Sequence, residues 1–433
     1  MTNRSHNSYG AMILPDGKYY SLDDRETRRN NNVLVVGTTG AAKTRTVITP
    51  NLLECVGSYV VTDPKGNLYC QWGDYLKTQG YRVVRLSFIH PEESVHYNPL
   101  NYVTTTQQIQ QLSSVLINKN KSGHADPFWD DSSLMLLNSL IAYVKECPGV
   151  LPAEENFHAI LELLRMAGRG NSIRKDSVLS QAMENLHEYN EKSWAYKQFQ
   201  NVNQSPDKTF DTIIATTIAK FCSMDTDELA EMMQDDEIDI ISIGQQKTAV
   251  FVEVSDSDRS MDALINLFFT QTMNQLCIYA DEECENNQLP VPVRFFMDDF
   301  ATNCKIENFE NMISNIRSRK ISVILILQSL SQLENSYGQS AHTIVDDCDT
   351  LIYMGGNDPE TAHSIAVRCN KTTHTILHMP ICTSWIFRRG EKPFMCRNIE
   401  LDDYLQEKKI ISSPIKRKHR KEIWEQDIIP LCS

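Results

Sequence analysis

The 433-residue chain has no long apolar segment. Its longest purely apolar runs, such as Val323–Leu327, are far shorter than the roughly 18 residues that span a bilayer as a helix. The chain also has fewer basic residues than acidic ones, 42 against 56, so its formal net charge is −14. This balance argues against a protein that binds nucleic acid over its whole surface, although it leaves room for a local basic groove. The first residues carry no apolar core and do not resemble a secretory signal. We expect a cytoplasmic protein, or one held peripherally at the inner face of the cell membrane by something else.

Closely spaced cysteine pairs are absent as well. The sequence contains 12 cysteines, and no two of them are separated by only two residues. This spacing gives no support for a zinc ribbon or a thioredoxin-like dithiol. Several of the cysteines lie in apolar patterns, where a reduced thiol acts as a small hydrophobic group. The composition is otherwise that of a globular protein, and the length allows two or three domains.

The pattern of apolar residues divides the chain into parts. Short apolar strands alternate with helices in residues 1–104 and again in residues 245–400, and such alternation predicts an α/β fold with a mainly parallel, twisted sheet. Residues 105–244 show helical periodicity instead, which predicts an all-helical domain inserted into the α/β domain. Residues 11–22 carry a Pro-Asp-Gly turn between two short strand-like runs and predict an N-terminal hairpin. Residues 401–433 form a tail with a basic run that either contacts acidic lipid or nucleic acid or is a solvated extension.

The first chemical signal is the segment VLVVGTTGAAKT, residues 33–44. A buried strand followed by a glycine-containing turn and a helix is the context in which backbone N–H groups hold phosphate oxygens. Lys43 is expected to reach the β- and γ-phosphates, and Thr44 is expected to place its hydroxyl on Mg²⁺. The full motif has glycine where this chain has Ala42, so an ordinary strand-to-helix turn is the alternative interpretation. The residues expected to contact the nucleotide here are Gly37, Thr38, Thr39, Gly40, Ala41, Ala42, Lys43 and Thr44.

The second signal is the acidic pair that follows an apolar strand in Arg294–Phe300. Asp298, at the carboxyl end of that strand, fits the acid that orders Mg²⁺. Asp299 is expected to orient the attacking water as a general base, although glutamate is the common choice there. The alternative is a solvated acidic pair at a strand end.

Five segments together resemble the TraG/TraD family of conjugative coupling proteins, which are P-loop ATPases of type IV secretion systems. They are GTTGAAKT with the downstream Pro50–Leu53, Thr62–Gly66, Asp126–Trp129, Met297–Ala301, and Ile326–Gln332 before Tyr353–Asn357. Their order and spacing cover about residues 30–400. The resemblance implies a RecA-like motor domain interrupted by an all-helical domain, hexameric rings, ATP and Mg²⁺ as cofactors, and transport of single-stranded DNA with its attached relaxase-type protein.

The resemblance also suggests roles for residues outside the two signals. Gln328 resembles the family's γ-phosphate sensor, and its alternative is a glutamine in an ordinary strand-end turn. Arg317 stands where the family places an arginine that reaches the neighbouring subunit's nucleotide, but it also fits a solvated helix end. Asp63 and Lys65 are expected beside the phosphate loop, where Lys65 contacts phosphate and Asp63 organises the loop. A tight turn built by the neighbouring proline and glycine is the alternative for this pair.

Three departures from the family affect the functional prediction. The sequence lacks the family's usual N-terminal membrane anchor, so we expect a separate membrane component of the secretion system as its partner. Ala42 and Asp299 each predict slow ATP hydrolysis.

The leading hypothesis is a coupling-protein ATPase that delivers single-stranded DNA and attached protein to the transfer channel. The alternatives are a nucleotide-binding scaffold or cargo adaptor with little or no hydrolysis, and a soluble DNA translocase of the HerA/FtsK-like group.

Overall fold

The computed structural model describes residues 10–117, 127–151, 154–167, 177–221, 224–255, 257–303, 306 and 308–413. Two features singled out in the sequence lie outside the described residues. They are the basic run Lys416–Lys421 and Asp126, the first residue of the Asp-Pro-Phe-Trp segment.

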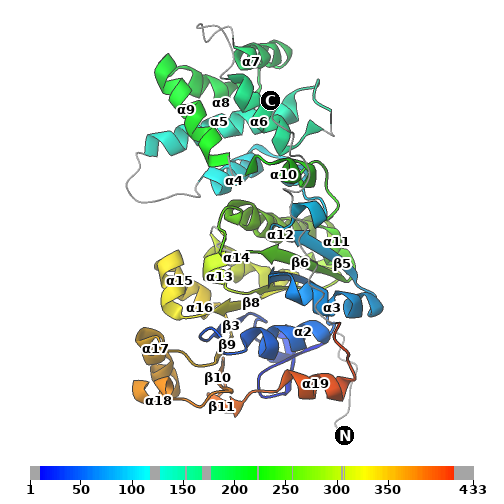
Figure 1. The fold of residues 1–433 in the computed structure, drawn as a ribbon, viewed down its shortest axis with the longest axis vertical. Coiled ribbons are helices and arrows are strands. Elements are labelled where there is room, and N and C mark those ends of the chain that lie inside the picture. The colour runs from blue at the N-terminus through cyan, green and yellow to red at the C-terminus, as the bar shows by residue number, and fades with distance from the viewer. Residues whose placement is uncertain are drawn as a thin grey trace, which may run out of the picture.

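A nine-stranded sheet forms the centre of the described chain (Figure 1). Seven neighbouring strands, from β9 to β5, are parallel, whereas β10 pairs antiparallel with β9 and β11 antiparallel with β10. The spatial order is β11 (Phe394–Arg397), β10 (Thr383–Arg388), β9 (Thr350–Tyr353), β3 (Val33–Val36), β8 (Ile321–Leu327), β7 (Val293–Met297), β4 (Ser58–Pro64), β6 (Thr248–Val254) and β5 (Arg82–Ser87). The RecA-like P-loop fold expected from the sequence is confirmed.

The central strands are apolar throughout because helices cover both faces of the sheet. Alternate residues of β3 belong to different cores: Leu34 and Val36 pack on one side, and Val33 and Val35 on the other. The first side is covered by α12 (Asp262–Glu283), α13 (Phe300–Asn303), α14 (Phe309–Asn315), α15 (Leu330–Tyr337), α16 (Ser340–Asp346), α17 (Pro359–Cys369) and α18 (Thr373–Leu377). The second side is covered by α2 (Thr49–Leu53), α3 (Asn67–Thr78) and α19 (Leu401–Lys408).

The N-terminal hairpin lies where the Pro-Asp-Gly turn predicts it. Strands β1 (Ala11–Ile13) and β2 (Tyr19–Ser21) pair antiparallel as a separate two-stranded sheet, and α1 (Asp24–Thr27) follows. The buried Asn51 ties the hairpin to α2, because its side chain accepts a hydrogen bond from the Ile13 N–H and donates one to the Ile13 carbonyl. The hairpin is therefore part of the second core.

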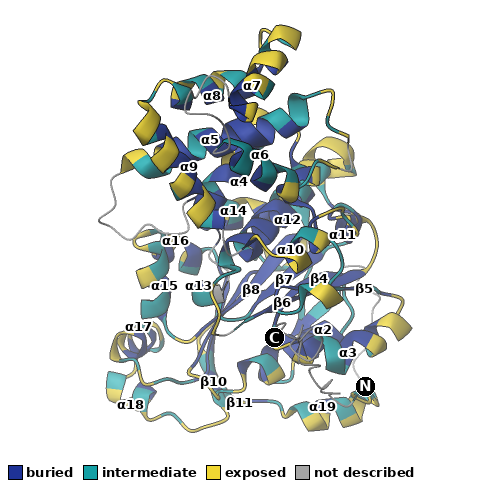
Figure 2. Ribbon diagram, turned by 45° about the horizontal axis from the view of Figure 1, so that its top comes forward, coloured by how far each residue is buried: buried dark blue, intermediate teal, exposed yellow. Residues whose placement is uncertain are grey.

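Between β5 and β6 the described residues form helices and no strand. The helices are α4 (Thr106–Ile117), α5 (Pro127–Glu146), α6 (Phe157–Ala167), α7 (Val178–Tyr189), α8 (Trp194–Asn203), α9 (Asp207–Phe221), α10 (Asp227–Met232) and α11 (Ser242–Gln245). Most of them gather beyond one end of the sheet, at the top of Figure 1, and α4 packs against α12 of the sheet domain. Figure 2 shows that the sheet is buried, while exposed residues concentrate on the outer helices.

Candidate nucleotide-binding site

The loop after β3 is held between the ends of its two neighbouring strands. The Gly37 N–H donates to the Leu327 carbonyl of β8 at 3.1 Å, and the Thr38 N–H donates to the Gly355 carbonyl after β9 at 3.0 Å. A Cβ on Gly37 would approach the Met354 Cβ to 3.0 Å, closer than most side chains tolerate. Glycine at position 37 therefore lets the segment after β9 pack tightly against the loop.

Two residues of the loop adopt left-handed backbone conformations. Gly40 has φ of 84° and Ala42 has φ of 59°. A left-handed residue with a Cβ costs roughly 1–2 kcal/mol, a cost that glycine does not carry. The departure from the motif at position 42 therefore introduces backbone strain in this loop. The chain then continues into a single π-helical segment, η1 (Thr44–Ile48), and α2.

Lys43 is turned toward the loop itself. Its Nζ donates to the carbonyl oxygens of Gly37 at 2.6 Å and Thr38 at 3.1 Å, and its side chain is buried. Burial lowers the pKa of Lys43, and the nearby carboxylates of Asp298 and Asp299 oppose that shift. A lysine held at this position is ready to exchange carbonyl contacts for phosphate oxygens.

Thr44 and Asp298 meet directly. The Thr44 hydroxyl donates to Asp298 Oδ2 at 2.8 Å, and the Asp298 N–H donates to the Thr62 hydroxyl of β4 at 2.6 Å. Burial raises the pKa of Asp298, and the hydrogen bond from Thr44 opposes the shift. A hydroxyl and a carboxylate are oxygen ligands of the kind that Mg²⁺ prefers, so this pair fits a magnesium ion. Thr62 had no assigned role from the sequence, because its contact depends on the pairing of β4 with β7.

Asp299 and Gln328 also lie together, at the carboxyl ends of β7 and β8. Gln328 Nε2 donates to Asp299 Oδ1 at 3.3 Å. Asp299 has φ of 49°, a conformation that aspartate accepts more readily than most residues. The structure thus brings the predicted base and the predicted sensor into contact beside the loop.

Asp63 and Lys65 are not beside the phosphate loop. Strands β8 and β7 lie between β3 and β4, so the expected position of this pair is wrong. The Asp63 carboxylate instead accepts N–H bonds from Leu68 at 2.9 Å and Tyr69 at 2.8 Å, at the start of α3. Burial, with the nearby Glu253, raises the pKa of Asp63 to about 7. Lys65 is exposed in the turn that follows.

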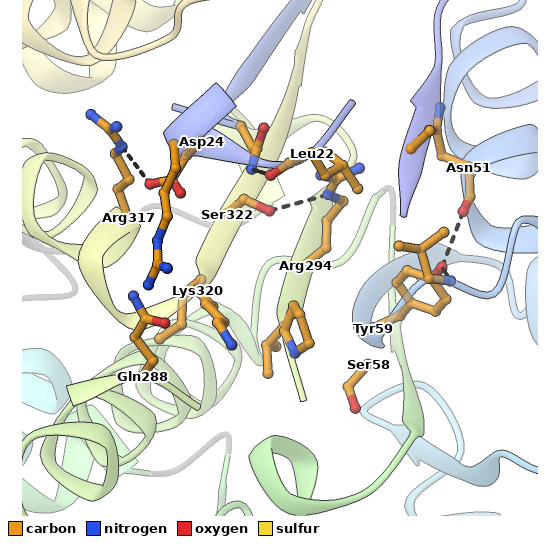
Figure 3. Close-up of a pocket in the computed structure, with 17 residues that line it drawn as sticks. Leu22, Asp24, Asn51, Ser58, Tyr59, Gln288, Arg294, Arg317, Lys320 and Ser322 are labelled. Carbon is orange, nitrogen blue, oxygen red and sulfur yellow. Dashed lines mark hydrogen bonds and ion pairs between the residues drawn. The ribbon is translucent and has the colours of Figure 1, made fainter. Parts of the chain in front are cut away.

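Arg317 also lies away from the phosphate loop of its own chain. It belongs to a short 3-10 helix, η9 (Ile316–Arg319), which precedes the amino end of β8, whereas the loop follows the carboxyl end of β3. Its Nε donates to Asp24 Oδ2 at 3.1 Å (Figure 3). Within one chain, the parallel sheet separates Arg317 from Lys43.

Glu253 is a buried acid that the sequence interpretation missed. It accepts hydrogen bonds from Arg85 Nε at 2.7 Å and from Nη2 at 2.9 Å, and a Cβ on Gly66 would lie 2.5 Å from its Oε1. A side chain at position 66 would crowd this carboxylate, and the left-handed backbone there, with φ of 67°, also favours glycine. The available signal was a glutamate inside the otherwise apolar run Thr248–Val254.

The phosphate loop, the Thr44–Asp298 pair and the sheet order define a P-loop nucleotide-binding fold of the RecA-like type. The family model described as "Type IV secretory system Conjugative DNA transfer" matches residues 3–381. This chain belongs to that family.

The relatives and solved structures that resemble the chain agree with this assignment. A probable conjugal transfer protein TraG of Sinorhizobium fredii is 23% identical over 78% of this chain and 52% of its own length, and a VirD4 protein of Rhizobium radiobacter is 24% identical over 76% and 46%. The conjugative coupling protein TrwBdeltaN70 superposes with a TM-score of 0.66 at 15% identity, over 90% of this chain and 88% of that one. TrwB has also been solved with the ATP analogue ADPNP and with ADP and Mg²⁺.

The chain spans about half the length of the TraG and VirD4 relatives. None of the helices in the described part of the chain combines the length and the apolar character needed to cross a membrane.

Proposed function

We propose that the chain is a coupling-protein ATPase of a conjugative type IV secretion system, which binds ATP with Mg²⁺ and delivers single-stranded DNA and attached protein to the transfer channel. The observation that supports it best is the 2.8 Å hydrogen bond between Thr44 and Asp298. That bond joins the end of the phosphate loop to the acid after β7. The TrwB complexes with ADPNP and with ADP and Mg²⁺ add support by analogy.

In this proposal each of the chain's own groups has a distinct role in nucleotide binding or hydrolysis. The ammonium of Lys43 leaves the carbonyls of Gly37 and Thr38 and pairs with the β- and γ-phosphates. Thr44 and Asp298 hold Mg²⁺, which neutralises phosphate charge when bound. Asp299 orients the attacking water and accepts its proton, and Gln328, already bonded to Asp299, responds to the loss of the γ-phosphate.

Assembly into a ring is the second part of the proposal. Arg317 lies at the amino ends of the parallel strands and the phosphate loop at their carboxyl ends, so in this proposal Arg317 acts on a nucleotide held by another copy of the chain. A guanidinium suits this role because it remains charged and binds phosphate oxygens in a fork. We propose a hexamer, with relaxase-type cargo and a membrane component of the secretion system as partners.

Steady-state ATP hydrolysis, measured with and without single-stranded DNA at concentrations that allow assembly, tests this function. We expect slow turnover that DNA accelerates. The second candidate is a nucleotide-binding scaffold with no appreciable turnover, which the left-handed backbone at Ala42 favours. Saturable ATP binding without hydrolysis under all these conditions would decide for the scaffold.

A further inference from the structure

A cavity at the amino ends of β4, β7 and β8 gathers positive charge (Figure 3). Its volume is about 60 Å³, and Arg25, Arg294, Arg317 and Lys320 contribute to its lining. Asp24 is the one acid among the described residues that line it, and Asp24 is paired with Arg317. A cavity with this excess of cations is notable in a chain whose net charge is −14.

Arg294 is the central residue of this cavity. It is the second residue of β7 and is 8% exposed, and its Nε donates to the Ser322 hydroxyl at 3.1 Å. Its neighbour across the strand pair is Tyr59, and among the described residues no carboxylate forms an ion pair with it. Burial lowers the pKa of Arg294 to about 10. A buried guanidinium without an acid is costly, and an anionic ligand would offset that cost.

The size and chemistry of the cavity restrict what such an anion can be. The cavity volume of about 60 Å³ is more than one water molecule needs. A small oxyanion fits this space. Guanidinium groups bind phosphate oxygens in forks, and Arg294 has one nitrogen, Nε, on Ser322 while its other nitrogens remain for a ligand.

We propose that this cavity binds a single phosphate-class oxyanion, with Arg294 as the buried ligand and with Arg25 and Lys320 at the rim. The anion is either a free ion or the terminal phosphate of a nucleotide that a neighbouring copy of the chain holds. Binding of a free ion does not depend on the phosphate loop, which lies at the other end of the strands, whereas the second source rests on the proposed nucleotide binding and assembly.

The first experiment is thermal unfolding of the full chain in inorganic phosphate and in chloride at equal ionic strength. All variants carry Lys43→Ala, so that phosphate at the nucleotide site contributes little. We expect phosphate to raise the Tm saturably, and Arg294→Met to weaken the apparent phosphate affinity roughly 10- to 100-fold. Arg368→Met, which removes an exposed arginine of α17, is the matched control and should keep the response.

Two variants separate a loss of phosphate binding from a loss of folding. Arg294→Met removes an uncompensated buried charge, so in chloride its Tm should equal or exceed that of the parent. Arg25→Gln changes an exposed residue of the rim and should weaken phosphate binding several-fold without disturbing the core.

A second experiment distinguishes the two sources of the anion. A free ion stabilises the chain at concentrations where it is monomeric. A phosphate from a neighbouring copy gives no such response, but Arg294→Met, with Lys43 intact, then weakens assembly in sedimentation with a non-hydrolysable ATP analogue. If Arg294→Met changes neither the phosphate response nor the assembly, the cavity is not an anion site.

Discussion

The Thr44 hydroxyl lies 2.8 Å from Asp298 Oδ2, although 254 positions separate the two residues. The contact arises because β3 and β7 are parallel strands with only β8 between them, so their carboxyl ends meet at one edge of the sheet. Gln328, which follows β8, lies at the same edge and bonds to Asp299. The candidate site is therefore a product of the sheet order.

Nucleotide affinity should depend on Lys43. In Lys43→Ala the charged hydrogen bonds to phosphate are lost, which costs about 1.5–3 kcal/mol, or roughly a 10- to 150-fold rise in Kd. Titration with a fluorescent nucleotide measures this change. Lys77→Ala, on the exposed face of α3, is the control and should bind as the parent does. Unchanged, saturable affinity in Lys43→Ala would contradict the assignment of the phosphate loop.

The sequence predicted those parts of the site that depend on local patterns. The buried run Val33–Val36 with its glycines predicts a strand and a phosphate loop, and the run before Asp298 predicts a second strand. The order of strands in the sheet depends on long-range pairing, which no local pattern contains. The misplacement of Asp63 follows from this, because its strand is second in sequence but is separated from β3 by two others.

Other features of the fold and the site could not be predicted from the sequence for a related reason. Strands β10 and β11 were not predicted, because the buried alternate residues of β10 are Ser384, Ile386 and Arg388, and only one of the three is apolar. The turn of Lys43 onto Gly37 depends on the loop backbone and not on the motif. The boundaries of the all-helical domain, residues 105–244, remain a prediction.

Stability should depend on pH through Asp63. Its folded pKa of about 7 lies above the ordinary value of 3.8, so the folded chain holds this proton more tightly than the unfolded chain. The contribution is therefore fully present below 3.8 and is lost as the pH rises toward 7, by at most about 1.4 kcal/mol per pH unit. Urea unfolding of Asp63→Asn should show a flatter dependence over this window. Asp74→Asn, an exposed change on α3, should keep the parent's slope.

We expect that the all-helical segment can be deleted while the sheet still folds, and that the loss of stability depends on the boundaries of the deletion. Replacing residues 105–244 by a short flexible linker leaves β5 and β6 as adjacent strands, so the sheet should still fold. The same deletion removes α4, whose buried Leu112 lies against α12, and we expect a loss on the order of 2–5 kcal/mol.

A variant that replaces only residues 118–226 keeps α4 and is the matched comparison. It should unfold at higher urea concentration than the larger deletion, and both should lose cargo binding. If neither variant retains the cooperative unfolding of the sheet, residues 105–244 share one core with the motor and are not a separate domain.

Turnover should require Arg317 from a neighbouring copy. Arg317→Ala should abolish hydrolysis while leaving ATP affinity nearly unchanged, because the arginine acts on charge that develops in the transition state. In the parent, activity should rise more than linearly with protein concentration. Asp24→Asn is the control, since it removes the ion pair of Arg317 but keeps the guanidinium, and it should stay active. Full activity in Arg317→Ala would exclude this role.

The two departures at positions 42 and 299 decide between a motor and a scaffold. Ala42→Gly removes the strain of a left-handed alanine and should raise the free energy of unfolding by about 1 kcal/mol. Asp299→Glu extends the carboxylate by one methylene toward the attacking water. We expect the parent to hydrolyse ATP slowly and the double variant to do so faster, because Lys43, Thr44 and Asp298 are the same in both.

Gly40→Ala is the matched control for position 42, since it adds a Cβ at φ of 84° and should lower stability by a similar amount. If the parent shows no hydrolysis at assembling concentrations and only the double variant is active, the natural chain is a scaffold and the slow-motor proposal fails.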